Sequence, residues 1–171
     1  RSEMQISRFT VDLPGAFSLK GGGILENLTD SLTRSGTIGL DMVTRNLNFL
    51  TGLTGVTPDG SLVIPDSMSL KMKMEMNGPQ YKAKLDLKEG KGSMNVNAAL
   101  NSLTEVYTAD LKINDLQLHH FLPKDSIYEL SLSADAKGRG LDVMSFHSLA
   151  NLNLSLDQLH YARYHLSNVH L

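Results

Sequence analysis

The sequence predicts an all-β, mainly antiparallel fold, and three features of the chain lead to this prediction. In the segment SMSLKMKMEMN, apolar residues from Met68 to Met76 alternate with Ser, Lys and Glu, as in a strand with one apolar and one polar face. Runs of this kind recur at a step of 13 residues, starting at Met68, Tyr81, Met94 and Tyr107. Short segments rich in Gly, Asn and Ser separate the runs and predict tight turns. Together these features indicate a meander of half-buried strands.

Residues 1–60 are expected to be less regular than the rest. Alternating apolar residues predict strands at 9–13, 17–19 and 38–42. A Pro-Gly turn follows the first of these strands. The three consecutive glycines at 21–23 predict a break after the second strand.

Two segments of this region lose the alternation and carry apolar residues at helical spacing. These residues are Ile24, Leu25, Leu28 and Leu32 in one segment and Val43, Leu47, Leu50 and Leu53 in the other. The spacing predicts short helices near residues 24–33 and 44–54. Asn, Thr and Gly are poor helix formers, so the alternative is a pair of irregular loops whose Leu and Phe side chains plug one end of the sheet.

Residues 61–171 contain the repeated strands. After the run at 68–76, alternating runs occupy residues 81–87, 94–100, 107–113, 128–136 and 150–156. The connections are Asn77-Gly78-Pro79, Glu89-Gly90-Lys91-Gly92, Asn101-Ser102 and Lys137-Gly138-Arg139-Gly140. Such residues supply the backbone angles that hairpin turns require, so sequential strands are expected to be antiparallel neighbours.

Each repeated strand contributes one apolar stripe, and the stripes are expected to share one face of the sheet. The residues predicted to form this surface are Met68, Leu70, Met72, Met74, Met76, Tyr81, Ala83, Leu85, Leu87, Met94, Val96, Leu100, Tyr107, Leu111, Ile113, Leu130, Leu132, Leu152 and Leu154. No long amphipathic helix is predicted that would cover them. The sheet must therefore cover itself, as a sandwich, as a closed barrel, or as a curled sheet with a partly open apolar groove.

Composition limits the partners of this chain. The 171 residues include 16 basic and 18 acidic side chains, which give a formal net charge of -2 and no basic stripe, so nucleic-acid binding is not expected. Without cysteine, the chain can form neither disulfides nor thiolate metal sites. It begins at Arg1 without a Met and lacks an apolar run long enough to span a membrane, so we expect it to be an internal segment of a longer protein.

No catalytic or metal site is predicted, and we expect neither enzyme activity nor a cofactor. In a strand, His119 and His120 would face opposite sides, and the spacing of five residues between His160, His165 and His170 also alternates faces. The sequence contains no G-x-S-x-G motif and no thiol nucleophile.

The order of several short motifs from residue 62 onward resembles the AsmA-like, TamB-type (translocation and assembly module) proteins of Gram-negative bacteria. The motifs are Ile64-Pro65-Asp66, Gly90-Lys91-Gly92, Tyr107-Thr108-Ala109-Asp110-Leu111, Phe121-Leu122-Pro123, Ala136-Lys137-Gly138-Arg139-Gly140-Leu141-Asp142 and the ending from Tyr161 to Leu171. The resemblance covers more than half of the chain.

This resemblance implies that residues 1–171 form a single segment of a long β-taco, a curled sheet with an open apolar groove. The parent protein would be anchored in the inner membrane, stand in the periplasm and meet an outer-membrane assembly protein through parts absent from this sequence. Its implied roles are phospholipid transport between the membranes and assistance to outer-membrane protein assembly. The partners of this segment would be phospholipid acyl chains and the adjacent repeats of the same chain.

The methionines suit that role, because their flexible, polarizable side chains adapt to irregular apolar partners. The alternative is a closed β-sandwich that serves as a scaffold or adhesion module, with a packed core and no lipid conduit.

Overall fold

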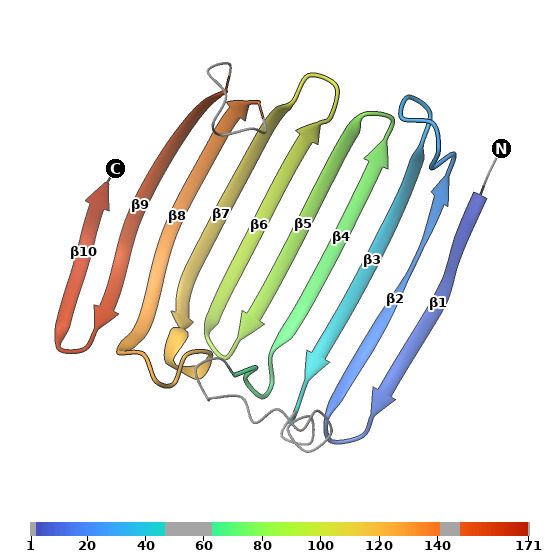
Figure 1. The fold of residues 1–171 in the computed structure, drawn as a ribbon. Helices are drawn as coiled ribbons and strands as arrows, with labels where there is room; N and C mark the ends of the chain where they lie inside the picture. The colour runs from blue at the N-terminus through green and yellow to red at the C-terminus, as the bar shows by residue number, and fades with distance from the viewer. Residues whose placement is uncertain (1–2, 47–62, 141–147, 171) are drawn as a thin grey trace.

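The computed structural model describes residues 3–46, 63–140 and 148–170. In this part of the chain, ten strands form one antiparallel sheet in which each strand pairs with its neighbours in sequence (Figure 1). Strands make up 72% of the described residues, far above the fifth to quarter of an ordinary globular domain. The sheet is not closed, and its first and last strands are its two edges. The predicted all-β antiparallel fold is confirmed.

The element bounds follow the predicted runs and extend most of them. The strands are β1 (Glu3–Leu13), β2 (Phe17–Glu26), β3 (Ser35–Thr44), β4 (Ser69–Asn77), β5 (Gln80–Glu89), β6 (Gly92–Asn101), β7 (Val106–Gln117), β8 (Ile127–Arg139), β9 (Leu149–Tyr161) and β10 (Tyr164–His170). A short 3₁₀ helix, η1 (Leu118–His120), lies between β7 and β8.

The helix predicted near residues 24–33 is wrong. Ile24 and Leu25 belong to β2, where successive side chains point to opposite faces of the sheet. Leu28 and Leu32 lie in the turn that leads to β3, so the helical spacing results from a strand followed by a turn. Of the helix predicted near 44–54, Thr44 ends β3, and residues 47–54 lie outside the described residues.

Asp30 organises the turn between β2 and β3. Its carboxylate accepts hydrogen bonds from the Leu32 backbone N–H at 2.9 Å and from the Thr33 hydroxyl at 2.8 Å. These two bonds hold the pKa of the Asp30 carboxyl below its usual value. A side chain that bonds to backbone two residues ahead is typical of turns, and it competes with helix formation here.

The break predicted at the three glycines is also wrong, because β2 runs through Gly21, Gly22 and Gly23. The glycines permit close contact with neighbouring strands. A Cβ at Gly21 would lie 2.6 Å from Cζ of Phe9, and one at Gly23 would collide with the Thr37 carbonyl oxygen. Because Gly21 and Gly23 have no side chains, β2 can pair closely with β1 and β3 at these positions.

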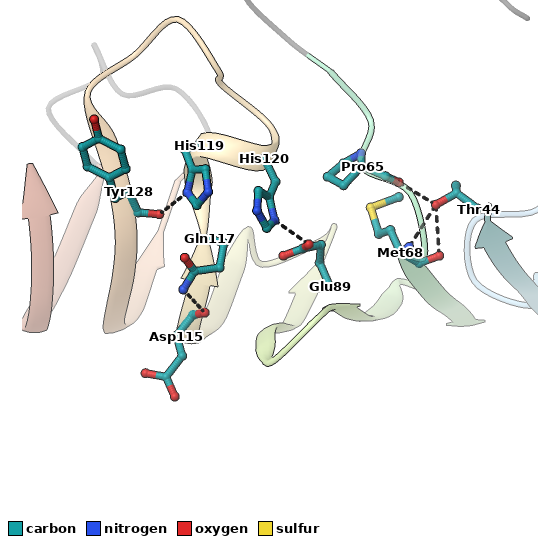
Figure 2. Close-up of polar contacts among 9 residues, drawn as sticks. All are labelled: Thr44, Pro65, Met68, Glu89, Asp115, Gln117, His119, His120 and Tyr128. Carbon is teal, nitrogen blue, oxygen red and sulfur yellow. Dashed lines mark hydrogen bonds and ion pairs between the residues drawn. The ribbon is translucent and has the colours of Figure 1, made fainter. Parts of the chain in front are cut away.

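One end of the sheet is covered by the chain itself, where residues before β4 bond to the end of β3 (Figure 2). The Thr44 hydroxyl, at the end of β3, donates to the Pro65 carbonyl oxygen at 2.8 Å and accepts from the Met68 N–H at 3.0 Å. Val63 donates its backbone N–H to the Phe121 carbonyl oxygen at 2.7 Å, which joins this segment to the residue after η1. Thr44 and Met68 are buried as a result.

Glu89 is buried at the same end of the sheet. Its Oε1 lies 2.7 Å from Nδ1 of His120 in η1, which fixes the helix over the last residues of β5 (Figure 2). Ile113 and Leu116 are buried beside it. Together with Ala16 and Met68, they are the buried hydrophobic residues of the described chain, so the small core lies at this end.

We predict that Thr44→Val destabilises the chain by about 1–3 kcal/mol, because it leaves the buried Pro65 carbonyl and Met68 N–H without their partner. Chemical denaturation measures the change. Thr44→Ser keeps the hydroxyl and serves as the control. Equal stability of the Val and Ser variants would show that the hydroxyl does not hold the two segments together.

A second prediction concerns the glycines. Gly23→Ala should cost about 1–3 kcal/mol, because its Cβ has no room beside Thr37. Gly39→Ala, in the neighbouring strand β3, should be neutral or stabilising by up to about 1 kcal/mol, because nothing lies within 4 Å of its Cβ. Unfolding curves of the two variants test this difference, and a reversed order would contradict the packing described for β2.

Candidate functional site

The pairing register places the predicted apolar residues on one face of the sheet, because directly opposite residues of antiparallel strands project from the same side. Four rows cross the sheet from β4 to β9. They are Leu70–Leu87–Met94–Ile113–Leu132–Leu156, Met72–Leu85–Val96–Leu111–Ala134–Leu154, Met74–Ala83–Ala98–Ala109–Ala136–Leu152 and Met76–Tyr81–Leu100–Tyr107–Gly138–Ala150. Leu130 lies on the same face opposite Leu116 and Leu159. We call this surface the apolar face.

The apolar face continues into β1–β3, which the sequence-based selection left out. Met42, Leu40 and Ile38 of β3 lie opposite Leu70, Met72 and Met74 of β4. Leu19 of β2 and Val11 of β1 extend the first of these rows to the sheet edge. The alternation at 38–42 was the signal for this extension, but the glycines hid the continuity of β2.

A row of small side chains runs along the apolar face. Four alanines, one on each of β5 to β8, lie between Met74 and Leu152. The rows on either side contain larger residues, such as Leu85 and Leu111 on one side and Tyr81 on the other. This row of small side chains lies between two rows that contain larger ones and crosses the strands.

Most of the apolar face has no covering layer in the described chain. Met74 is 41% exposed and Leu152 is 65% exposed, whereas Met68 and Ile113 are only 5% and 7% exposed at the covered end. The chain exposes 11565 Å², against about 8,300 Å² for a compact monomer of its 18.8 kDa mass. This larger exposed area is expected for a sheet with only one layer.

A cation lies at the opposite end of the apolar face. The Arg34 guanidinium stands over the Tyr81 ring, 5.0 Å from its centroid. Its Nε donates to the Gly78 carbonyl oxygen at 3.2 Å, and an Nη lies 3.4 Å from the Ser102 hydroxyl. The turn between β2 and β3 thus places a positive charge beside an apolar row.

The polar face carries charges of both signs. Lys73 and Lys84 lie directly opposite each other, and each pairs with an acid on its own strand, Glu75 and Asp86 respectively. The hydrogen bond and charge of Lys73 hold the pKa of the Glu75 carboxyl below its usual value. These pairs offset the repulsion between the two lysines.

A hollow of about 1170 Å³ lies over β1–β5, and its lining includes Lys20, Asp41, Lys71 and Lys73 of the polar face together with the glycines of β2. It lies mainly on the other side of the sheet from the predicted lipid surface. Its mixed charges make it a poor site for acyl chains. In the described residues, the apolar face is therefore an open surface crossed by a row of alanines.

The histidines do not lie as predicted. His119 and His120 are in η1, and His119 Nδ1 lies 3.3 Å from the Tyr128 carbonyl oxygen. His160 and His165 are opposite each other in the hairpin of β9 and β10, where their rings stack with centroids 4.0 Å apart. The prediction that these two alternate faces is wrong, because a hairpin turn separates them. No group of three His, Cys, Asp or Glu residues suited to a metal ion occurs in the described residues.

No protein-family model, curated protein or solved structure matches this chain. The AsmA-like, TamB-type assignment therefore rests on the sequence motifs alone and is a proposal. Within the described residues, no helix has the length and apolar character needed to cross a membrane.

Proposed function

We propose that this chain is a segment of an apolar surface along which phospholipid passes between two membranes, in a protein of AsmA-like, TamB type. The parent protein would be anchored in the inner membrane and stand in the periplasm. A role in outer-membrane protein assembly, through a partner at the outer membrane, belongs to the same proposal. The observation that carries it is the continuous apolar face that the described chain leaves uncovered.

The dimensions of the face suit an acyl chain. Ten strands at a spacing of about 4.8 Å give rows roughly 43 Å long, about twice the length of an extended acyl chain. The row of alanines runs along this direction, so a chain lying on it would cross several strands. It could move along the row without meeting a polar side chain.

The energy of such contact favours passage over tight binding. Burial of a methylene contributes about 0.8 kcal/mol, so full burial of most of an acyl chain would contribute roughly 10 kcal/mol before ordering costs. A chain lying on an open face buries only one side and gains correspondingly less. Flexible Met72 and Met74 offer adaptable contacts without a shaped pocket.

Arg34 supports the same proposal. A guanidinium at the end of an apolar row is suited to a phosphate oxygen, because it donates several hydrogen bonds in a planar fork. A phospholipid with its chain beside Tyr81 would bring its headgroup to this end.

The alternative function is a scaffold or adhesion module. Its packed-core form has no counterpart in the described strands, which make one open sheet and not two packed ones. A scaffold role would instead require a protein partner to cover the apolar face. Lipid contact distinguishes the two functions.

We predict that Met74→Arg leaves the chain folded and lowers lipid contact several-fold. Met74 is 41% exposed, so the guanidinium can stay in water, yet it places a charge at the start of the alanine row. The measurement is photocrosslinking to vesicles of phosphatidylethanolamine with a photoreactive acyl chain, together with thermal unfolding. Asn97→Arg adds the same charge on the exposed polar face and is the matched control, which should crosslink as the unchanged chain does.

Two outcomes would contradict the proposal. Global unfolding of Met74→Arg with a stable control would mean that the face is packed against something in solution. Crosslinking that is equal in both variants would mean that lipid does not use the apolar face.

A further inference from the structure

The two edge strands of the sheet carry apolar-face residues with the same irregular spacing, which arises at a bulge in β1 and without a register shift against β9 in β10. In β1, Ile6 and Phe9 face Gly23 and Gly21 of β2, so two residues of β1 oppose one residue of β2. Two apolar-face residues of β1 are therefore three positions apart instead of two.

The other edge repeats this spacing. In β10, Leu166 and Val169 lie opposite Leu159 and Leu156 of β9 and are also three positions apart. Asn168, between them, has a φ of 57°, which marks the irregularity in β10. The same three-residue spacing is present in β9, because the register of β9 against β8 shifts at the corresponding position.

A bulged edge discriminates among strands that could pair with it. A regular strand would match the apolar and polar residues on one side of the bulge only, which is how bulges protect edges from unwanted pairing. A strand with the same three-residue spacing would match on both sides. Each edge of this sheet is thus suited to the other.

We propose that β10 of one copy of this chain pairs with β1 of the next copy, with Leu166 opposite Phe9 and Val169 opposite Ile6. β1 and β10 run in opposite directions in the sheet, so the added strand continues the antiparallel order (Figure 1). The result is one sheet whose apolar face continues from copy to copy. The proposal goes beyond the lipid role and does not depend on it.

The remaining residues of β1 and β10 agree with this register. It places Tyr164 opposite Val11 on the apolar face and His165 opposite Thr10 on the polar face. It also brings Arg163, in the turn before β10, beside Asp12, so opposite charges meet.

Neighbouring registers fail at the bulge. A shift of two residues in one direction places Val169 opposite Arg8, and the opposite shift places Leu166 opposite Ser7. A shift of one residue turns every apolar side chain to the polar face. One register therefore satisfies both strands.

Both edges are accessible. Every residue of β10 is exposed, and in β1 all but Ile6 are exposed. Because the two surfaces differ, the contact is head-to-tail and leaves a free edge at each end, so it produces an open series of copies and not a closed dimer.

Disulfide crosslinking tests the register directly, because the chain has no cysteine of its own. In the double variant Thr10→Cys/His165→Cys, the two positions would be directly opposite in adjacent copies, within the Cα separation of a disulfide. Mild oxidation of the concentrated chain should give a ladder of linked multimers. The control Thr10→Cys/Ser167→Cys places the thiols two residues out of register, beyond disulfide range, and should give a several-fold weaker ladder.

The remaining outcomes overturn the proposal. A linked monomer would mean that one sheet closes on itself, and equal ladders in both variants would mean that association has no register. Circular dichroism checks that the variants fold. Should a double variant fail to fold, the mixed single variants Thr10→Cys and His165→Cys replace it, with a heterodimer expected. Sedimentation velocity of the unchanged chain should show association that grows with concentration, and a strictly monomeric chain would contradict the proposal.

Discussion

The register of antiparallel pairing is the constraint on which the whole surface depends. Side chains alternate between faces, so a slip of one residue in any strand would turn its apolar stripe towards the polar side. Hydrophobic alternation within strands and short turns between them fix this register from β4 to β7. Where the spacing changes, as at Ile113 and Leu116 in β7, a bulge restores both residues to the apolar face. The Asp115 N–H at that bulge donates to the Ser131 hydroxyl at 2.8 Å, which holds the irregular backbone.

A sheet of this kind is stabilised differently from a compact domain. In the described residues, the buried hydrophobic side chains lie at one end of the sheet, so most of the face contributes through cross-strand pairs, which are worth roughly 0.2–1 kcal/mol each. The backbone ladders supply the remaining local order. An apolar face of this size exposed to water favours any partner that covers it, and the open edges favour continuation of the sheet. The fold and the two proposals thus have a common physical origin.

The sequence predicts the strands well where structure is local. Alternation and turn residues are sufficient for β4 to β7, because a strand of about ten residues and a short turn account for the 13-residue step, and alternation alone predicts β8 and β9. The prediction fails in β2 and in the turn after it, because the spacing of Leu28 and Leu32 arises from that turn and the glycines of β2 are required by contacts with other strands. The sequence predicts the apolar face in β4 to β9 only. The bond from Thr44 to Pro65 and the bulge at Ile6 depend on residues distant in sequence, so no local pattern reveals them.

Oxidation of the methionines tests most directly whether the apolar face is uncovered. In the lipid-free chain, mild peroxide should oxidise Met74 nearly as fast as in the unfolded chain, whereas buried Met68 should be protected. Mass spectrometry of peptides from the native and denatured chain gives both rates. Protection of Met74 that appears only when phospholipid is added would agree with the account. If Met74 were as protected as Met68 without lipid, the face would be covered in solution, and its description as an open surface would be wrong.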